Sequence, residues 1–456
     1  MDRELRWYDY LTINSYWFAL TTRSQTLSPL VVPLLVQRFV GETVKGTFVG
    51  RMRLWSLMVA VLVQAAMGLF SDRNTLRWGR RRPFILVGTL GELVIFALIG
   101  LTASMEGMAG YWSLFALYTL SMVASNTAHA ATQGLIPDLV PEEKRGRASG
   151  IKALLELPVP LIFSSFVIAK MIEGGNLWGA LVTLMTVMVV SMAITMFVPE
   201  ERLRIPPKDG IGETLVRLAL MTGAFTVVIL GTGAVANVVL RGFAALAGGW
   251  TTVLTVLAGV ITMGGAVLVG VWASVAISLG GDVREHHSFV WWVTNRLAFL
   301  VAATNLATFM VYFLQERFVD LPGEKAAGPA AQVMMFVGIF IMVTAVPSGW
   351  LADRFGKRLL VAVAGAVAAV GIAVILLVPT IPALYLAGSL IGAAMGLFYS
   401  ANWALGTEIV PPKEAGRYLG LSNVAGAGAG AIGAYIGGPI ADQHGYVVLF
   451  TIYGAL

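Results

Sequence analysis

Long apolar runs separated by short polar segments set the pattern of this chain. A helix needs about 20 mostly apolar residues to cross a bilayer. On that measure we expect fourteen runs, the last of them partial. They are 11–37, 53–71, 84–103, 111–135, 149–170, 177–198, 217–240, 249–280, 290–315, 331–352, 359–379, 383–405, 418–439 and 446–456. The final run, "YVVLFTIYGAL", has 11 residues and is too short to span, so we expect a last helix that is cut short. The pattern predicts an all-α polytopic membrane protein.

The polar segment "PEERLRIPPKDGIGET" divides these runs into groups of six, two and six. We therefore expect a six-helix bundle over 1–198 and a cytoplasmic linker over 199–216. Two inserted helices and a loop would follow over 217–289, and a second six-helix bundle over 290–456.

Composition agrees with a membrane protein and narrows the chemistry. Hydrophobic residues make up 57% of the chain, charged residues 12%, and mean hydropathy is +0.79. Soluble domains carry about twice that charged fraction. With no cysteine and four histidines, there is little room for a metal centre, and we expect no metal and no cofactor. No Walker, Gly-x-Ser-x-Gly or His-Glu-x-x-His motif is present, so neither an enzyme nor ATP-driven transport is indicated.

The basic residues predict an orientation. With the N-terminus in the cytoplasm and alternating spans, the cytoplasmic segments hold about 20 of the 31 Lys and Arg residues. That asymmetry follows the positive-inside rule, and it explains the basic pI without nucleic acid as a partner. The first outside loop, with Arg38, Lys45, Arg51 and Arg53, disagrees with it.

Two signatures occur twice, in the same order. "GLFSDRNTLRWGRRR" at 68–82 matches "GWLADRFGKR" at 349–358, with four extra residues before the second glycine of the first copy. "PDLVPEEKRGRASG" at 137–150 aligns with "TEIVPPKEAGRYLG" at 407–420, which pairs Asp138 with Glu408. The chain therefore reads as a duplicated six-helix unit. Both copies of a loop lie on one membrane side only if an even number of helices separates the units.

The repeated Gly-x-x-x-Asp-Arg-x-Gly-Lys-Arg pattern resembles the signature of the major facilitator superfamily of secondary transporters. The expansion and the ending "RRRPFI" are similar to the branch that transports sucrose, glycosides, pentosides and hexuronides. This resemblance implies two pseudo-symmetric bundles, with a site between them near the bilayer midplane. It also implies a cytoplasmic gating motif made of Gly68, Asp72, Arg73, Gly79, Arg80, Arg81, Gly349, Asp353, Arg354, Gly356, Lys357 and Arg358.

The carboxylates of this motif can accept charge-assisted hydrogen bonds from arginine. Such a cluster could hold one bundle against the other in one state and release it in the other. Alternatively, Arg80, Arg81 and Arg82 only contact anionic headgroups and fix the topology.

Ionisable residues inside spans are costly and point to function. Arg23 and Glu92 lie mid-span and could pair in the cavity, where Glu92 would exchange a proton, or they could form a purely structural pair. Arg296 could reach the cavity or extend to the cytoplasmic surface. Lys152 and Glu156 are four residues apart, which favours a local ion pair.

Two further spans carry polar side chains that suit a hydroxyl-rich solute. Asn126, His129 and Gln133 share one helix face, and Tyr399 and Asn402 lie on the corresponding span of the second half. Helix–helix hydrogen bonding is the alternative for the first three, and for Tyr399 it is a place at the membrane interface, where tyrosine and tryptophan are common.

The resemblance has gaps at the coupling positions. The acidic residue expected on span four of plant-type sucrose symporters aligns with Met122, and span two offers only Gln64 in place of the acids of melibiose-type permeases. Proton coupling would then need Glu92, Glu156 or His129, and facilitated diffusion stays open.

We expect a monomeric proton symporter of a sugar or other small polar solute in the cytoplasmic membrane. The alternatives are an exporter of amphipathic compounds and a non-transporting membrane assembly factor.

Overall fold

The computed structural model describes the backbone of residues 5–200, 212–244, 250–279, 287–410 and 415–456. This part of the chain is helical apart from short connections and contains no strand. Each of the fourteen apolar runs expected from the sequence overlaps a helical segment among the described residues, and the final run corresponds to a helix that begins at Tyr446 and ends at Ala455.

The first half contains six helical passes, three of them built from several segments. They are α1 (Trp7–Thr26), the π-helical turn η1 (Leu27–Val31) and α2 (Val32–Val40); α3 (Lys45–Asp72); α4 (Arg82–Thr102); α5 (Gly107–Gln133) with α6 (Leu135–Leu139); η2 (Glu142–Lys144), α7 (Arg145–Glu156), α8 (Pro158–Phe163), the π-helical turn η3 (Ser164–Ile168) and α9 (Ala169–Glu173); and α10 (Leu177–Thr195).

The remaining helices are mostly long and uninterrupted, apart from the short η5 and α18. They are α11 (Gly212–Ala244), α12 (Trp250–Leu279), α13 (His287–Arg317), η5 (Gly323–Ala326), α14 (Ala327–Phe355), α15 (Lys357–Leu377), α16 (Ile381–Ile409), α17 (Ala415–His444) and α18 (Tyr446–Ala455).

The glycines of the repeated motif have a backbone role. Gly356 has φ 92° and Gly79 has φ 112°. These angles strongly favour glycine, because a residue with a Cβ would clash with its own backbone there. Gly356 ends α14 and lets α15 begin at the next residue. The motif therefore specifies a sharp reversal between two long helices.

Ten helices among the described residues are long and apolar enough to cross a membrane. Helices α1, α5 and α17 are also at least 20 residues long but are not among the ten, so fourteen spans stay a prediction. The helix that carries the second span begins at Lys45, eight residues before the apolar run that begins at residue 53. Lys45, Arg51 and Arg53 therefore lie in α3, and most of the discrepant positive charge leaves the first outside loop.

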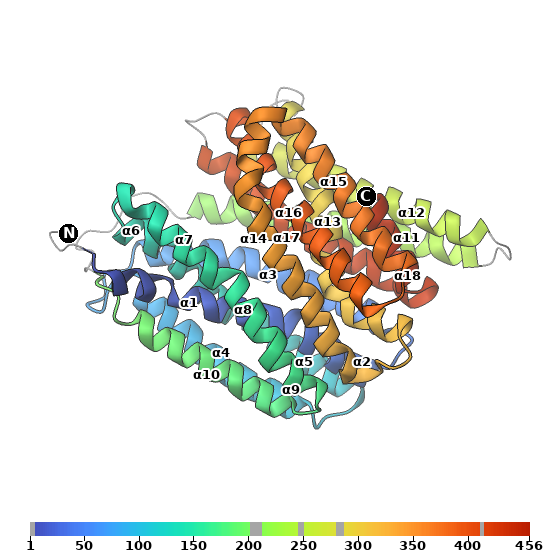
Figure 1. Cartoon of the computed structure of the whole chain (residues 1–456), viewed down its shortest axis with the longest axis horizontal. Coiled ribbons are helices and arrows are strands. Elements are labelled where there is room, and N and C mark those ends of the chain that lie inside the picture. Colours follow the sequence, from blue (N-terminus) through green and yellow to red (C-terminus); the bar gives the residue numbers. More distant parts are fainter. Residues whose placement is uncertain (1–4, 201–211, 245–249, 280–286, 411–414) are drawn as a thin grey trace.

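The helices form two groups that diverge from one another (Figure 1). Within the first group α4 packs on α5, α5 on α3, and α1 on α10; within the second α14 and α15 pack on α16 and α13 on α17. Helices α11 and α12 pair with each other and lie against α17, with α3 and α18 beside them. The division into domains expected from the sequence is compatible with this arrangement and stays a prediction.

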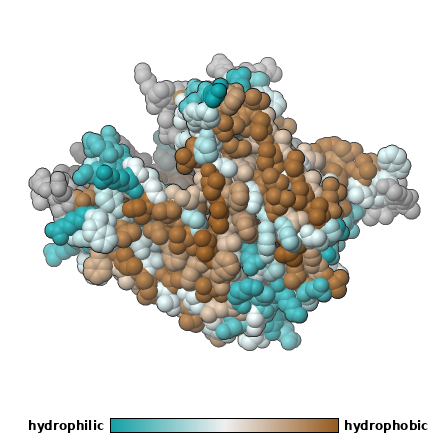
Figure 2. All heavy atoms as spheres, in the orientation of Figure 1, coloured by the Kyte–Doolittle hydropathy of each residue, from teal (hydrophilic) through white to brown (hydrophobic). Residues whose placement is uncertain are grey.

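The surface is apolar between polar ends. Figure 2 shows hydrophobic residues over the middle of both groups, and hydrophilic residues gathered at the outer tips of the groups and at the end where the groups meet. Exposed apolar side chains include Val87 and Val94 of α4, Val227 of α11 and Ile261 of α12. Apolar exposure of this extent is expected where lipid is the solvent.

Candidate functional site

A buried ion pair lies in the first half. The Nε of Arg23 in α1 donates to Oε2 of Glu92 in α4 at 3.1 Å, and its Nη2 lies 3.3 Å from Oε1. Ser121 in α5 accepts from Arg23 at 2.5 Å and donates to Glu92 at 2.6 Å. Arg23 is 5% exposed and Glu92 is fully buried. The expected pairing is therefore present, and the hydroxyl of Ser121 bridges the two charges.

The polar residues of the fourth pass contact mainly their own helix. The Nδ2 of Asn126 donates to the carbonyl of Met122, and the side chains of His129 and Gln133 hydrogen-bond to each other at 3.2 Å. The ring of His129 meets that of Trp17 edge-on, with 5.4 Å between centroids. The three residues share a helix face as expected, and their binding role stays a prediction.

Trp17 connects this face to a basic residue. The Nζ of Lys152 lies 3.9 Å from the centroid of the Trp17 ring and 3.1 Å from Oε2 of Glu156. The local ion pair expected for Lys152 and Glu156 is confirmed.

The second half holds a matching polar cluster. Nη1 of Arg296 in α13 donates to Oδ1 of Asn402 in α16 at 3.1 Å, and the guanidinium lies 5.8 Å from the ring centroid of Trp403. The indole of Trp292 donates to the carbonyl of Asn402 at 2.8 Å. Tyr399 is one turn before Trp403 on the same helix. Arg296, Tyr399 and Asn402 are therefore brought together.

Sequence reasoning missed Arg53, which it placed at a loop boundary. This arginine lies two turns inside α3, and its Nη1 donates to Oγ of Ser28 in the π-helical turn η1 at 2.5 Å. Its Nη2 would lie 3.9 Å from a Cβ added to Gly430 of α17. The missed signal was the basic pattern in "KGTFVGRMRLW", where polar residues begin an amphipathic helix before the apolar run.

The first copy of the repeated motif is a compact ionic cluster. Arg81 pairs with Asp72 at 2.5 Å and with Asp138 at 2.8 Å, and Arg80 reaches the same two carboxylates at 3.4 and 2.7 Å. Glu200 accepts from the backbone amides of Arg81 and Arg82 at 2.5 and 3.2 Å. Burial raises the pKa of Glu200, against the lowering effect of these amides.

The other motif residues of this copy frame the cluster. Gly68 and Asp72 lie in the last turns of α3, Arg73 ends that helix, and Gly79 precedes the basic residues. All these contacts lie within the first half, so in this state the cluster does not hold one group of helices against the other.

The second copy keeps one equivalent contact. Lys357 pairs with Glu408, as Arg80 pairs with Asp138, which is the correspondence that the sequence alignment gives. Asp353 and Arg358 are exposed, and the guanidinium of Arg354 lies over Trp350 at 5.2 Å. Gly349 and Gly356 lie within and at the end of α14. We call the membrane side that carries both motif copies the motif side.

The two groups of helices meet at the side opposite the motif. Asp442 of α17 accepts from the amides of Gly46 and Thr47 at 2.8 and 2.7 Å. These amides belong to the first turn of α3, which has no side-chain cap of its own. A carboxylate of one half therefore caps a helix of the other, where the helix dipole favours negative charge.

Further contacts close the same side. The hydroxyl of Tyr312 donates to the carbonyl of Pro33 at 2.5 Å, and Gln315 donates to Gln37 at 2.9 Å. The backbones of α3 and α17 approach closely at Gly46 and Gly438, where neither position has room for a Cβ.

The burial of α14 changes along its length. Seven of its nine buried residues lie between Ala327 and Gly338, in the part near the closed side. Toward the motif side Val343, Val346 and Trp350 are 60%, 83% and 59% exposed. The two groups therefore pack against each other opposite the motif and diverge toward it (Figure 1), an arrangement that we call closed opposite the motif and open toward it.

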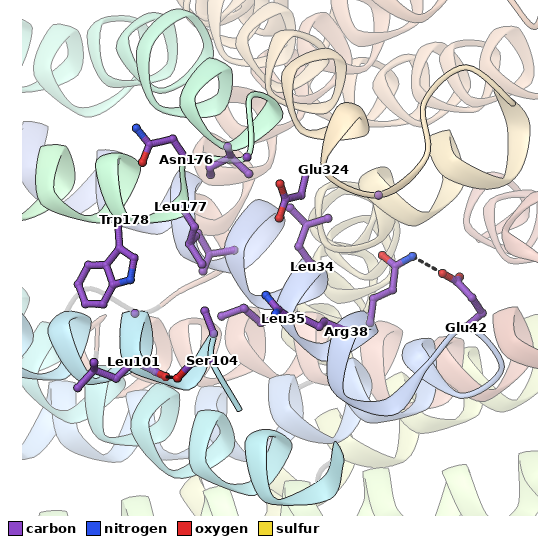
Figure 3. Close-up of a pocket in the computed structure, with 17 residues that line it drawn as sticks. Leu34, Leu35, Arg38, Glu42, Leu101, Ser104, Asn176, Leu177, Trp178 and Glu324 are labelled. Atoms are coloured by element: carbon purple, nitrogen blue, oxygen red, sulfur yellow. Dashed lines mark hydrogen bonds between the residues drawn. The ribbon is translucent and has the colours of Figure 1, made fainter. Parts of the chain in front are cut away.

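A pocket of about 670 Å³ lies near the closed side, away from the residues expected to form the site. Figure 3 shows Arg38, Trp178 and Asn176 of the first half around it, with Glu324 from the segment before α14. It contains none of the residues expected to bind solute.

A helical chain with this two-group arrangement and ionisable residues inside its spans has the architecture of a membrane transporter. The match to the model of the Major Facilitator Superfamily, over residues 19–434, identifies the family. The chain belongs to this superfamily of membrane transporters and is an integral membrane protein, and the resemblance stated from its motifs is confirmed.

Curated relatives match only over part of their length. The sucrose transport protein SUT1 of Oryza sativa subsp. japonica is 30% identical in an alignment of 110 residues, which covers 21% of this chain and 20% of the rice protein. The inner membrane symporter YicJ of Escherichia coli K12 is 28% identical over 176 residues, which are 35% of this chain and 36% of YicJ.

Solved structures of other transporters share the fold. A peptide transporter POT superposes with a TM-score of 0.67 at 15% identity, covering 98% of this chain and 91% of that one. The nucleoside transporter NupG gives 0.64 at 13% identity, covering 98% and 96%. At these identities the likeness concerns the fold alone.

Proposed function

We propose that this protein carries a small polar solute, a sugar or glycoside, across the cytoplasmic membrane by proton symport. The similarity of chain segments to a sucrose transport protein and to an inner membrane symporter supports the solute class. The excess of basic residues in the segments on the motif side supports a cytoplasmic location for that side and for the N-terminus.

The observation that carries the coupling proposal is the buried contact between Arg23, Glu92 and Ser121. An arginine stays charged at any physiological pH, so protonation of Glu92 is the change that can break this pair. A buried guanidinium that loses its counter-charge costs several kcal/mol. Solute hydroxyls can offset that cost by accepting its hydrogen bonds, which links proton binding to solute binding.

The linkage suits alternating access. A state that is open toward the motif side exchanges solute there, and the pair re-forms when the proton leaves. Arg296, Tyr399, Asn402 and the face of His129 would supply the remaining hydrogen bonds and ring contacts to the solute. Rocking of the two groups about the midplane would then expose the site to the other side.

The test is uptake of a panel of labelled glycosides into proteoliposomes, with and without an inward proton gradient. We expect gradient-driven accumulation of at least one glycoside. Glu92→Gln should lose that accumulation and keep exchange of internal for external solute, which needs no net proton movement. Glu106→Gln, which removes an exposed carboxylate directly before α5, is the matched control and should keep both activities.

Two results would count against the proposal. Accumulation that persists in Glu92→Gln would exclude this carboxylate as the coupling site. Absence of uptake of every glycoside under both conditions would exclude the solute class and favour export of amphipathic compounds or a non-transporting role.

A further inference from the structure

Positive and negative charges inside the described spans do not balance. Arg23 is neutralised by Glu92, whereas no described carboxylate forms an ion pair with Arg53 or Arg296. Both arginines lie about two turns inside helices long enough to span a membrane. Charged side chains at such depth are expensive unless they are paired, so this pattern calls for a partner.

The cluster around Arg296 contains hydrogen-bond donors that have no acceptor. Its Nη1 donates to Asn402, but its Nε is buried without an acceptor. The Nδ2 of Asn402 is likewise buried without an acceptor. A guanidinium and an amide that both lack acceptors match the needs of an oxyanion, which has several lone pairs and carries charge.

Arg53 also has a buried donor without an acceptor, at a different depth in the membrane. Its Nε is buried without an acceptor, and the hydroxyl of Ser28 is the partner of its Nη1. It lies where α3, η1 and α17 meet, so it faces the boundary between the two groups of helices. Ser24, one turn before Ser28, is exposed near the end of α1, although most residues around it in the first pass are buried, as expected for a residue that lines an aqueous path.

The two arginines lie at successive levels of this boundary. A Cβ on Gly430 would lie 3.9 Å from Nη2 of Arg53 and 3.8 Å from the hydroxyl of Thr304 in α13. Thr304 is eight residues from Arg296, or about 12 Å along the helix axis. Arg296 is therefore nearer the open motif side, and Arg53 lies deeper toward the closed side.

We propose that the transported solute carries an oxyanion, a carboxylate or a phosphate, which Arg296 contacts first and Arg53 contacts at the deeper level. This inference rests on the proposed transport function and specifies the charge of its substrate. A neutral solute would leave both guanidiniums without a counter-charge in this state. An oxyanion supplies charge-assisted hydrogen bonds that are roughly twice as strong as neutral ones.

The test compares matched solutes that differ in charge, by calorimetric binding to the purified full chain without any proton gradient. The first pair is p-nitrophenyl glucuronide and p-nitrophenyl glucoside, and glucose 6-phosphate with glucose adds the phosphate. A pair without a sugar is succinate and its dimethyl ester. We expect the anion of at least one pair to bind about 10- to 100-fold more tightly than the uncharged solute of the same pair.

Variants connect this preference to the arginines. Arg53→Gln and Arg296→Gln should each reduce the preference at least about tenfold, and Arg53→Lys should keep much of it. Arg51→Gln is the matched control, because Arg51 lies two residues away in α3, is exposed, and rests on the Phe48 ring at 5.3 Å. Gel filtration and thermal unfolding establish that each variant is folded.

The outcomes separate this inference from the proposed function. Tight binding of succinate that needs Arg53, with no binding of any sugar, would retain the anion site and remove the glycoside class. If every uncharged solute binds as tightly as the anion of its pair, or more tightly, the anion site is overturned, whatever the glycoside uptake shows. A preference for anions that survives in both glutamine variants would also overturn it.

Discussion

Removal of Asp442 should open the side that is closed in this structure. The carboxylate accepts hydrogen bonds from the amides of Gly46 and Thr47 at 2.8 and 2.7 Å, and these bonds cross between the two halves. A hydrogen bond to a charged group contributes about 1.5 kcal/mol at the lower end of measured values. Asp442→Ala therefore costs the closed arrangement about 3 kcal/mol.

That cost corresponds to a shift of about 100-fold in the equilibrium between the two states. A population that is 99% closed on this side would become divided roughly evenly. Because the chain contains no cysteine, two introduced cysteines can carry spin labels without removal of native ones. Ser104→Cys and Val319→Cys, both exposed, report the closed side; Trp78→Cys and Leu359→Cys report the motif side.

Electron-spin distance measurements should show a longer component on the closed side and a shorter one on the motif side in Asp442→Ala. Asp320→Ala removes an exposed carboxylate near the same membrane side and should leave both distance distributions unchanged. If Asp442→Ala is folded and its distributions match those of the unsubstituted protein, the reasoning that this carboxylate seals the closed side is refuted.

Two further predictions concern the motif side. Arg81→Ala should lower the free energy of unfolding by about 2 kcal/mol, because Asp72 and Asp138 lose their most buried partner while Arg80 still contacts both. Lys357→Ala should cost only about 0–1 kcal/mol, since its partner Glu408 is 59% exposed; equal losses in thermal unfolding would contradict the difference. Burial raises the pKa of Glu200, so the folded protein binds the proton of this carboxyl group more tightly than the unfolded chain does. The stabilisation from this difference is present at low pH and is lost as pH rises through the folded-state pKa. The stability of the unsubstituted protein relative to Glu200→Gln should therefore fall as pH rises above about 4.5, and a difference that does not vary with pH would count against it.

The helices could be predicted from sequence because lipid imposes a length requirement that apolar runs reveal directly. The duplicated motif predicted the correspondence between Asp138 and Glu408, and mid-span placement predicted that Arg23 and Glu92 could pair. Tertiary contacts between the halves were beyond such reasoning. Nothing in the local sequence of Asp442 indicates that it caps a helix almost 400 residues earlier in the chain.

Arg53 shows a different limit. A helix that begins outside the hydrocarbon region carries polar residues in its first turns, so a hydropathy window sets its start too late. Arg53, which lies in these first turns, is then assigned to the preceding loop. Only the contact with Ser28 and the close approach of Gly430 place it at the boundary between the halves.

The π-helical turn η1 changes the angular register of the first pass. Such a turn accommodates one more residue than an α-helical turn, which rotates the face of everything beyond it by about 100°. Before η1, Arg23 is directed into its own half; after it, the carbonyl of Pro33 meets Tyr312 of the other half. A single inserted residue thus lets one continuous helical pass contact two neighbours that lie on different sides of it.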